Sequence, residues 1–350
     1  MSYKKNLYLV GLFFVIVLFS KVFLSLLLEK HVKKNFINEY ILSKYSKDIR
    51  YDQFYLLNKN KYSFKTYLFC TSACLVMNPD NLIQNGRGFN VSIGAGQMSD
   101  FIKYFRWIIK NRSNPKKIFI GIEFYSLSDF PFIKSNPYEI EDNVLSKIKN
   151  LYLDLSFEKF IFDKYLLKRN AIFNEIEKQE EIDFANNGRR LYKQYSERKN
   201  SKKKLDEHKK KLINQKIKLF DGKISSKEIE NLNKLIKIAS QNNVKISLFF
   251  VPVHSSYLKW ENGRQFFNEL KLIKEILSQT DISEIIYFNN FNIINKDITY
   301  FEHDVSHMNY DAGVLIEEDL KNNKPELGIK INKHNLITQL SKLKIIYEEN

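Results

Sequence analysis

Apolar runs and segments with helical periodicity alternate along most of this chain. Five apolar runs are typical of buried strands, at residues 67–69, 88–94, 118–124, 244–251 and 285–288. Helical spacing predicts helices between them, near residues 99–110, 226–241 and 263–278, and a final helix from about Asn309. This alternation predicts an α/β three-layer sandwich with a central, mostly parallel sheet of about five strands.

Two other stretches depart from the alternation. Residues 130–230 are a long, charged, largely helical insert with no clear strand. Its basic part, residues 193–218, is either a solvated helix face or a surface that docks on anionic lipid or polymer. We expect residues 326–350 to form a C-terminal tail, so the α/β domain covers residues 63–325 around the insert.

The N-terminal residues predict a membrane anchor. An apolar segment at residues 6–28, with Lys21 inside it, approaches the roughly 20 residues needed to cross a bilayer. No small-residue cleavage site follows, which favours an uncleaved anchor at residues 1–29 over a signal peptide, and no polar face recurs as in a buried amphipathic helix. A helical stalk is expected at residues 30–62.

Lysines lie on both sides of this anchor, so the positive-inside rule alone does not select its orientation. Long C-terminal domains are exported despite flanking charge. We therefore expect a single-pass protein of the cytoplasmic (inner) membrane with its domain on the periplasmic side.

Composition narrows the class of partner. The chain has 350 residues, of which 44% are hydrophobic, and this is enough for one substantial core. Its formal charge of +16 indicates an anionic neighbour, either a membrane surface or an acidic envelope polymer. Nucleic acid is not expected, because no reading motif accompanies the charge. Cys70 and Cys74 could bond only if a turn brought their Cα atoms within roughly 7 Å, so we expect buried packing residues instead.

Candidate site residues follow the predicted strands directly. They are Ser72, Gly94, Tyr125, His254 and the loop from Asp304 to His307. Ligands of parallel sheets collect at the carboxyl ends of the strands, so these residues are expected to converge at one edge.

Serine needs a base to accept its proton, and the base needs a group that orients it. We interpret Ser72 as the nucleophile, His307 as the base and Asp304 as its orienter. The backbone N–H groups of Ser72 and Gly94 are candidate oxyanion donors. Structural alternatives remain for each: Ser72 or Asp304 as a helix cap and Gly94 as a turn residue.

Other residues at this edge are candidates to contact substrate, namely Asn90, Tyr125 and His254. His254 could instead be the base or a structural histidine. We expect no cofactor and no metal, because His254, His303 and His307 lack a convincing carboxylate or thiolate spacing.

The order of these motifs resembles the SGNH or GDSL-type hydrolase superfamily. The resemblance covers residues 63–320 without the insert, and is strongest at Cys70-Thr71-Ser72 and Asp304-Val305-Ser306-His307. It implies a flavodoxin-like fold and the same triad. The anchor and insert look most like the envelope branch, whose members assist D-alanylation of teichoic acids or O-acetylation of alginate and similar polymers.

Two positions depart from that family. Cys70 stands where the family usually has glycine, and residues 121–126 lack the asparagine that supplies an oxyanion donor. Tyr125 or Ser126 could donate in its place. Without a replacement, losing one oxyanion donor costs about 10²–10³ in rate.

Two functions are therefore open. The first is an acyl- or acetyltransferase or esterase that acts on a cell-envelope glycopolymer, with a membrane-bound acyltransferase as a further candidate partner. The second is a catalytically weak or inactive relative that binds an anionic glycopolymer or such an acyltransferase.

Overall fold

The computed structural model describes residues 53, 56–58, 60, 62–83, 86–112, 115–129, 183–191, 207, 223–302, 304–322 and 325–350. The predicted anchor at residues 1–29, most of the stalk and most of the insert lie outside these residues. Within the described ranges, none of the helices combines the length and the apolar character that a membrane span requires.

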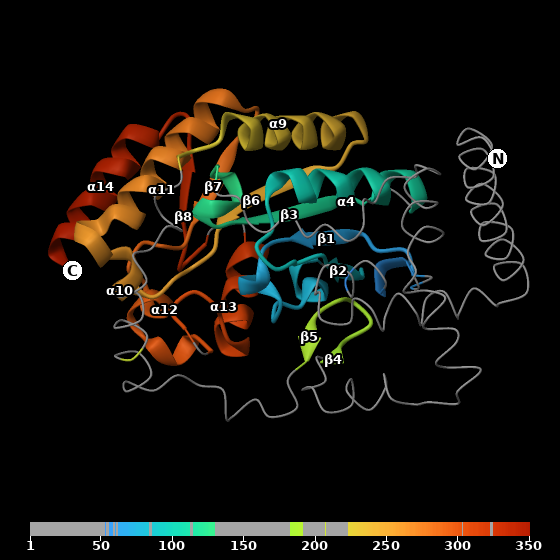
Figure 1. Ribbon diagram of the computed structural model, residues 1–350, viewed down its shortest axis with the longest axis horizontal. Coiled ribbons are helices and arrows are strands. Elements are labelled where there is room, and N and C mark those ends of the chain that lie inside the picture. The colour runs from blue at the N-terminus through green and yellow to red at the C-terminus, as the bar shows by residue number, and fades with distance from the viewer. Residues whose placement is uncertain are drawn as a thin grey trace, which may run out of the picture. The chain divides into compact units, whose positions relative to one another are not determined.

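The domain is α/β, with one six-stranded, mostly parallel sheet (Figure 1). Its strands are β1 (Thr66–Phe69), β2 (Gly88–Asn90), β3 (Lys117–Ile122), β6 (Lys245–Phe250), β7 (Glu284–Tyr287) and β8 (Ile329–Asn332). They lie in the order β2-β1-β3-β6-β7-β8, and β8 alone among them pairs antiparallel. The chain leaves β1 for β2 at one edge and then returns across β1 to β3. The carboxyl ends of β1 and β3 therefore flank the point where a doubly wound sheet binds its ligand.

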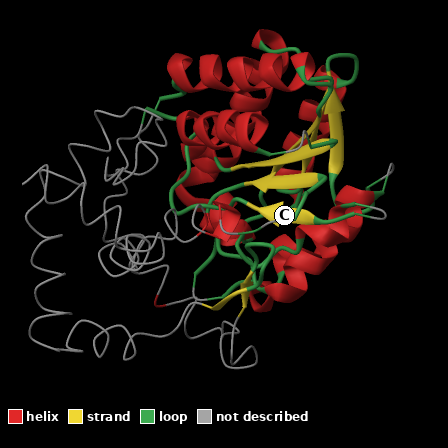
Figure 2. Cartoon of the chain, turned by 90° about the vertical axis from the view of Figure 1, so that its right-hand side faces the viewer, coloured by secondary structure: helices red, strands yellow, loops and turns green. Residues whose placement is uncertain are grey.

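Helices cover both faces of this sheet, as Figure 2 shows. The longer helices are α4 (Met98–Asn111), α9 (Ser226–Gln241), α11 (Trp260–Gln279), α13 (Tyr310–Lys321) and α14 (Leu336–Glu349). Short helices α10 (Ser255–Leu258) and α12 (Ile293–Lys296) follow β6 and β7.

Alternating side chains of β1 pack against the helix layers on the two faces of the sheet. Phe69 packs against Phe101 and Phe105 of α4, with ring centroids 6.0 and 6.1 Å away. The preceding residue, Leu68, belongs to a second buried cluster, which includes Ile316 of α13. Successive residues of a strand face opposite sides, so both faces of β1 are covered and both positions must be apolar.

Residues 326–350 form β8 and α14, where the sequence analysis predicts a tail, and β8 is one strand more than expected. A turn held by the buried Asp319 directs the chain back to β7. The carboxylate of Asp319 accepts hydrogen bonds from the backbone N–H groups of Glu326, Leu327 and Gly328. Ile331 is then buried opposite Ile285. A four-residue strand with one buried apolar position is too weak a pattern to predict from sequence.

The insert contains a short hairpin where the sequence analysis predicts no clear strand. Strands β4 (Asp183–Phe184) and β5 (Arg190–Leu191) pair antiparallel. The hairpin binds the rest of the domain: Asn90 N–H donates to Asn187 O in its turn at 2.8 Å, and Arg190 N–H of β5 donates to Leu75 O at 2.8 Å. This part of the insert therefore covers β2, which is an edge strand.

Candidate active site

Ser72 lies on a tight turn directly after β1, as predicted. Thr71 pairs with Ile93 in a single parallel bridge, and Ser72 then begins the 3₁₀ turn Ser72–Cys74. Thr71 is the cap of this turn, because its Oγ1 accepts a hydrogen bond from Ala73 N–H at 3.3 Å. The turn thus places the Ser72 hydroxyl at the carboxyl edge of the sheet.

A disulfide joins Cys70 and Cys74, so the prediction of two unbonded packing residues is wrong. Both are fully buried, as that prediction expected, but the turn brings their Cα atoms to 5.9 Å. Gly121 of β3 leaves room for the bond, because a Cβ there would lie 2.6 Å from Cys70 Sγ. The disulfide closes a loop with Ser72 at its centre.

Ser72 and His307 meet although 235 residues separate them. The distance from Ser72 Oγ to His307 Nε2 is 2.9 Å, and that from His307 Nδ1 to Asp304 Oδ2 is 2.5 Å. In a neutral imidazole, the proton on Nδ1 is donated to Asp304, which leaves Nε2 free to accept the serine proton. The structure therefore brings together all three predicted members of the triad.

The loop that carries His307 is held by Asp304 itself. Its Oδ1 accepts the backbone N–H groups of Ser306 at 2.8 Å and His307 at 2.7 Å. The alternative interpretation of Asp304 as the cap of the last helix is wrong, because Asn309 caps α13 through Ala312 N–H. Both carboxylate oxygens of Asp304 are thus used to orient His307.

Opposite pKa shifts accompany this contact. Burial disfavours the charged form of Asp304, but the hydrogen bonds and charge of His307 outweigh it and hold the Asp304 pKa well below its usual range. Burial also opposes the charging of His307, yet Asp304, with Glu123 and Glu302, raises the His307 pKa above its ordinary value. The pair favours an ionised Asp304 and stabilises an imidazolium.

Gly94 stands beside the nucleophile turn. Since Thr71 pairs with Ile93, the next residues on the two segments are Ser72 and Gly94. No described atom outside its neighbours lies within 4 Å of the position of a Cβ at Gly94. The two predicted oxyanion donors are therefore adjacent, and the space over Gly94 is open in the part of the chain that the structure describes.

Asn90 does not face this space. Its side chain is fully buried, and Nδ2 donates to Cys74 O and Met77 O at 2.9 Å each. Its Oδ1 accepts Ser92 N–H at 2.8 Å. With its polar atoms engaged in this way, Asn90 braces the segment after the nucleophile turn, which is a structural role in place of the predicted substrate contact.

His254 lies next to the loop of the triad and is 7% exposed. Its backbone N–H donates to Val305 O at 2.8 Å, and its Nδ1 caps α10 through Ser256 N–H at 3.2 Å. His254 thus ties the end of β6 to residues 304–307, whereas the histidine in contact with Ser72 is His307. Tyr125 lies in the 3₁₀ turn Phe124–Leu127 after β3, and only its backbone is described.

Glu269 anchors a buried polar network that the sequence analysis misses. It accepts hydrogen bonds from Gln265, Tyr287 and Asn289 at 2.8, 2.9 and 2.9 Å. Burial raises its pKa to about 7, although these hydrogen bonds oppose the shift. Asn289 Oδ1 in turn accepts Val253 N–H, which fixes the chain just before His254. The sequence signal for this network was Glu269 itself, a carboxylate on the otherwise mostly apolar face of α11.

Glu123 is a second residue without a predicted role. It is the first residue after β3, it is 9% exposed, and its Oε2 accepts a short hydrogen bond from Thr71 Oγ1. An acidic residue that directly follows a continuous apolar strand was the available signal.

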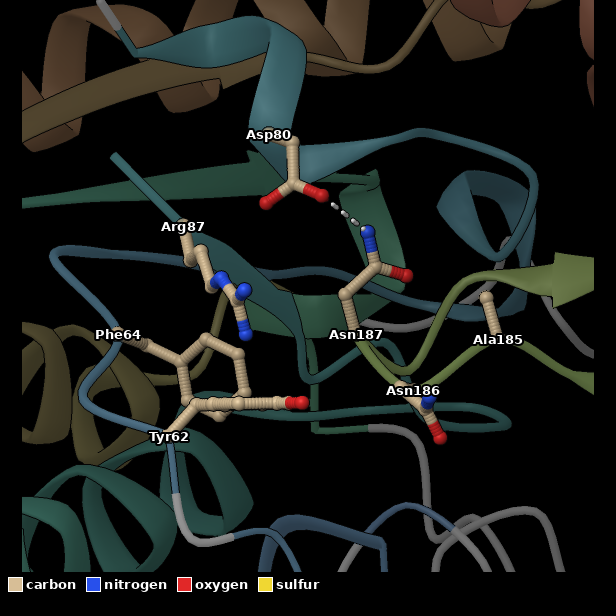
Figure 3. Close-up of a pocket in the computed structure, with 7 residues that line it drawn as sticks. All are labelled: Tyr62, Phe64, Asp80, Arg87, Ala185, Asn186 and Asn187. Carbon is tan, nitrogen blue, oxygen red and sulfur yellow. Dashed lines mark hydrogen bonds between the residues drawn. The ribbon is translucent and has the colours of Figure 1, made fainter. Parts of the chain in front are cut away.

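A cavity of about 420 Å³ lies elsewhere in the domain (Figure 3). Its lining residues are Tyr62, Phe64, Asp80, Arg87, Ala185, Asn186 and Asn187. Phe64 and Arg87 come just before β1 and β2, whereas Ser72 follows β1. This cavity therefore lies at the amino ends of these strands, away from the triad.

No family model matches the chain, and no curated protein matches it significantly.

Proposed function

We propose that this protein is a serine enzyme that transfers an acyl or acetyl group to a cell-envelope polysaccharide, or removes one from it. The observation that carries the proposal is the continuous relay from Ser72 Oγ through His307 to Asp304, with distances of 2.9 and 2.5 Å. A serine beside an oriented imidazole is the arrangement that makes its hydroxyl nucleophilic.

The reaction follows from the positions of these atoms. Ser72 Oγ attacks the acyl carbonyl carbon while its proton passes to His307 Nε2. The charge that develops on the carbonyl oxygen is stabilised by the backbone N–H groups of Ser72 and Gly94. Collapse of the tetrahedral intermediate expels the donor's alkoxide, which takes the proton from Nε2, and leaves acyl-Ser72. A sugar hydroxyl or water then attacks the ester and loses its proton to Nε2. When the second tetrahedral intermediate collapses, the bond to Ser72 Oγ breaks and Nε2 returns the proton to that oxygen.

Three features support the proposed fold family and location. The five parallel strands of the sheet lie in the order β2-β1-β3-β6-β7. Numbered among themselves, this is 2-1-3-4-5, the flavodoxin-like order expected of an SGNH-type domain. The disulfide between Cys70 and Cys74 fits an oxidising compartment, such as the periplasm. The charge of +16 suits an anionic glycopolymer or a bilayer surface. We propose a membrane-anchored enzyme with its domain outside the cytoplasm.

One observation favours a second function. Residues 121–126, after the third strand, lack the oxyanion-donating asparagine of the resembled family and include the acidic Glu123. An ionised carboxylate accepts hydrogen bonds and donates none. A catalytically inactive relative that binds a glycopolymer is therefore the alternative.

Release of acetate from a simple acetyl ester separates the two functions. We expect the full-length protein in detergent to release acetate, Ser72→Ala to release none, and His307→Ala to be slower by about 10²–10⁴-fold. Ser278→Ala is the matched control, since Ser278 lies on the exposed surface of α11. If the wild type releases acetate no faster than Ser72→Ala, the enzymatic function is contradicted and the binding protein is the function that remains.

A further inference from the structure

Glu123 reaches the nucleophile turn from the neighbouring strand. Strands β1 and β3 pair in parallel, with Phe69 opposite Ile120, so both chains leave the sheet at the same edge. Just beyond that edge, Thr71 Oγ1 donates its hydrogen bond to Glu123 Oε2. Thr71 is fully buried and Glu123 nearly so, which makes this contact costly to break.

The hydroxyl of Thr71 makes two contacts at once. It donates to Glu123 and accepts from Ala73 N–H at 3.3 Å. Thr71 and Ala73 are the residues on either side of Ser72. Glu123 therefore acts, through one hydroxyl group, on the segment that sets the direction of the Ser72 side chain.

Glu123 also contributes to the electrostatic environment of His307. The acidic groups that act on His307 are Asp304 and Glu302 of its own loop and Glu123 from the end of β3. Burial, together with the charges of Glu123, Glu269 and Asp304, raises the pKa of the Tyr257 hydroxyl of α10, which stays neutral. The charge near His307 thus comes from two segments that are distant in sequence.

We propose that Glu123 is a positioning residue of the proposed acyl-transfer site, which holds the Ser72 turn through Thr71 and places its carboxylate beside the residues that contact His307. The inference rests on the proposed function but needs no contact between Glu123 and substrate. It also gives a role to the one acidic residue among residues 121–126.

Two variants test the two parts of this role. Glu123→Gln keeps an oxygen that accepts from Thr71 but removes the charge. In histidine-labelled full-length protein in detergent, NMR should show the His307 midpoint lowered by about 0.5 pH unit or more. Thr71→Val removes the hydroxyl, and the exchange of Ala73 N–H should become about three- to tenfold faster.

Thr71→Ser is the matched control, because it restores the hydroxyl and should restore slow exchange at Ala73. If Glu123→Gln does not fold, Ala73 exchange in Glu123→Asp, which keeps the charge but shortens the side chain that reaches Thr71, tests the same contact and should become faster. An unchanged His307 midpoint in Glu123→Gln, or unchanged Ala73 exchange in Thr71→Val, overturns it. Neither measurement needs catalysis, so a wild type that releases no acetate would remove the proposed function without being mistaken for a failure of the Glu123 contacts.

Discussion

His307 is the residue whose protonation state decides whether Ser72 can be activated. Its Nε2 lies 2.9 Å from Ser72 Oγ and must be unprotonated to accept the serine proton. The carboxylate of Asp304 serves this base in two ways, since it fixes the Nδ1–H tautomer and favours the imidazolium that forms during attack. The same carboxylate keeps resting His307 protonated to a higher pH than an ordinary histidine.

The pH dependence of the reaction should therefore be displaced upward. Neutral His307 is the active form and its pKa is raised, so the rate should increase with pH through a midpoint above about 6.5, the ordinary histidine value. In Asp304→Asn the midpoint should move to lower pH while the maximal rate falls by about 10²-fold or more. Acetate release measured from pH 5 to 9 provides both values. A midpoint that does not respond to Asp304→Asn would contradict the ion pair.

The nucleophile turn is the element on which the proposed site depends most. Three contacts hold it: the Cys70–Cys74 disulfide, the Thr71 hydroxyl, and the Asn90 amide on Cys74 O and Met77 O. The position of the turn and its serine is predictable from the sequence because a buried apolar strand ends there. These three contacts are not predictable, since they depend on the 3₁₀ path of the turn and on neighbours from other strands.

The same distinction applies to the other elements. Helix α9 has the predicted bounds, Ser226–Gln241, because its apolar positions and the Ser225 cap are local signals. The β4–β5 hairpin and β8 have two and four residues per strand, and tertiary contacts define them. The convergence of Ser72, Asp304 and His307 was predictable because the carboxyl ends of parallel strands share an edge. The structural role of Asn90 was not, because sequence does not give burial at single residues.

Reduction of the disulfide should loosen the nucleophile turn. Opening so short a loop costs roughly 2 kcal/mol of stability by the chain-entropy model. We expect the rate of acetate release to fall several-fold after reduction with dithiothreitol and to recover on reoxidation. A Cys70→Ser, Cys74→Ser double variant should be slow from the start and insensitive to reductant, which makes it the control. Thiol titration should find no reactive thiol before reduction, and an undiminished rate in fully reduced protein would argue against a role for the bond.

At the scale of the whole molecule, the charge and the proposed anchor point to the same surroundings. The predicted span at residues 6–28 would hold the domain near a bilayer, where a charge of +16 is attracted to anionic lipid and envelope polymers. The triad lies at the carboxyl edge of the sheet and the cavity of Figure 3 at the amino ends of β1 and β2. The proposed reaction therefore takes place at the carboxyl edge of the sheet, not in this cavity.

The proposed topology has a direct test. Alkaline phosphatase fused after Asn350 folds into an active enzyme only in an oxidising compartment, so we expect an active fusion in a Gram-negative host. A fluorescent protein that matures only in the cytoplasm should be dark at the same position. The reverse pair of results would place the domain in the cytoplasm.

The most direct test of the central claim is the site at which a serine-directed fluorophosphonate reacts with the full-length protein. The relay predicts one covalent adduct on the peptide that contains Ser72, formed by the wild type and by Ser278→Ala. Labelling should be absent in Ser72→Ala and slower by about 10²–10⁴-fold in His307→Ala. Folded wild-type protein that acquires no adduct, or one labelled at another serine, would contradict the account.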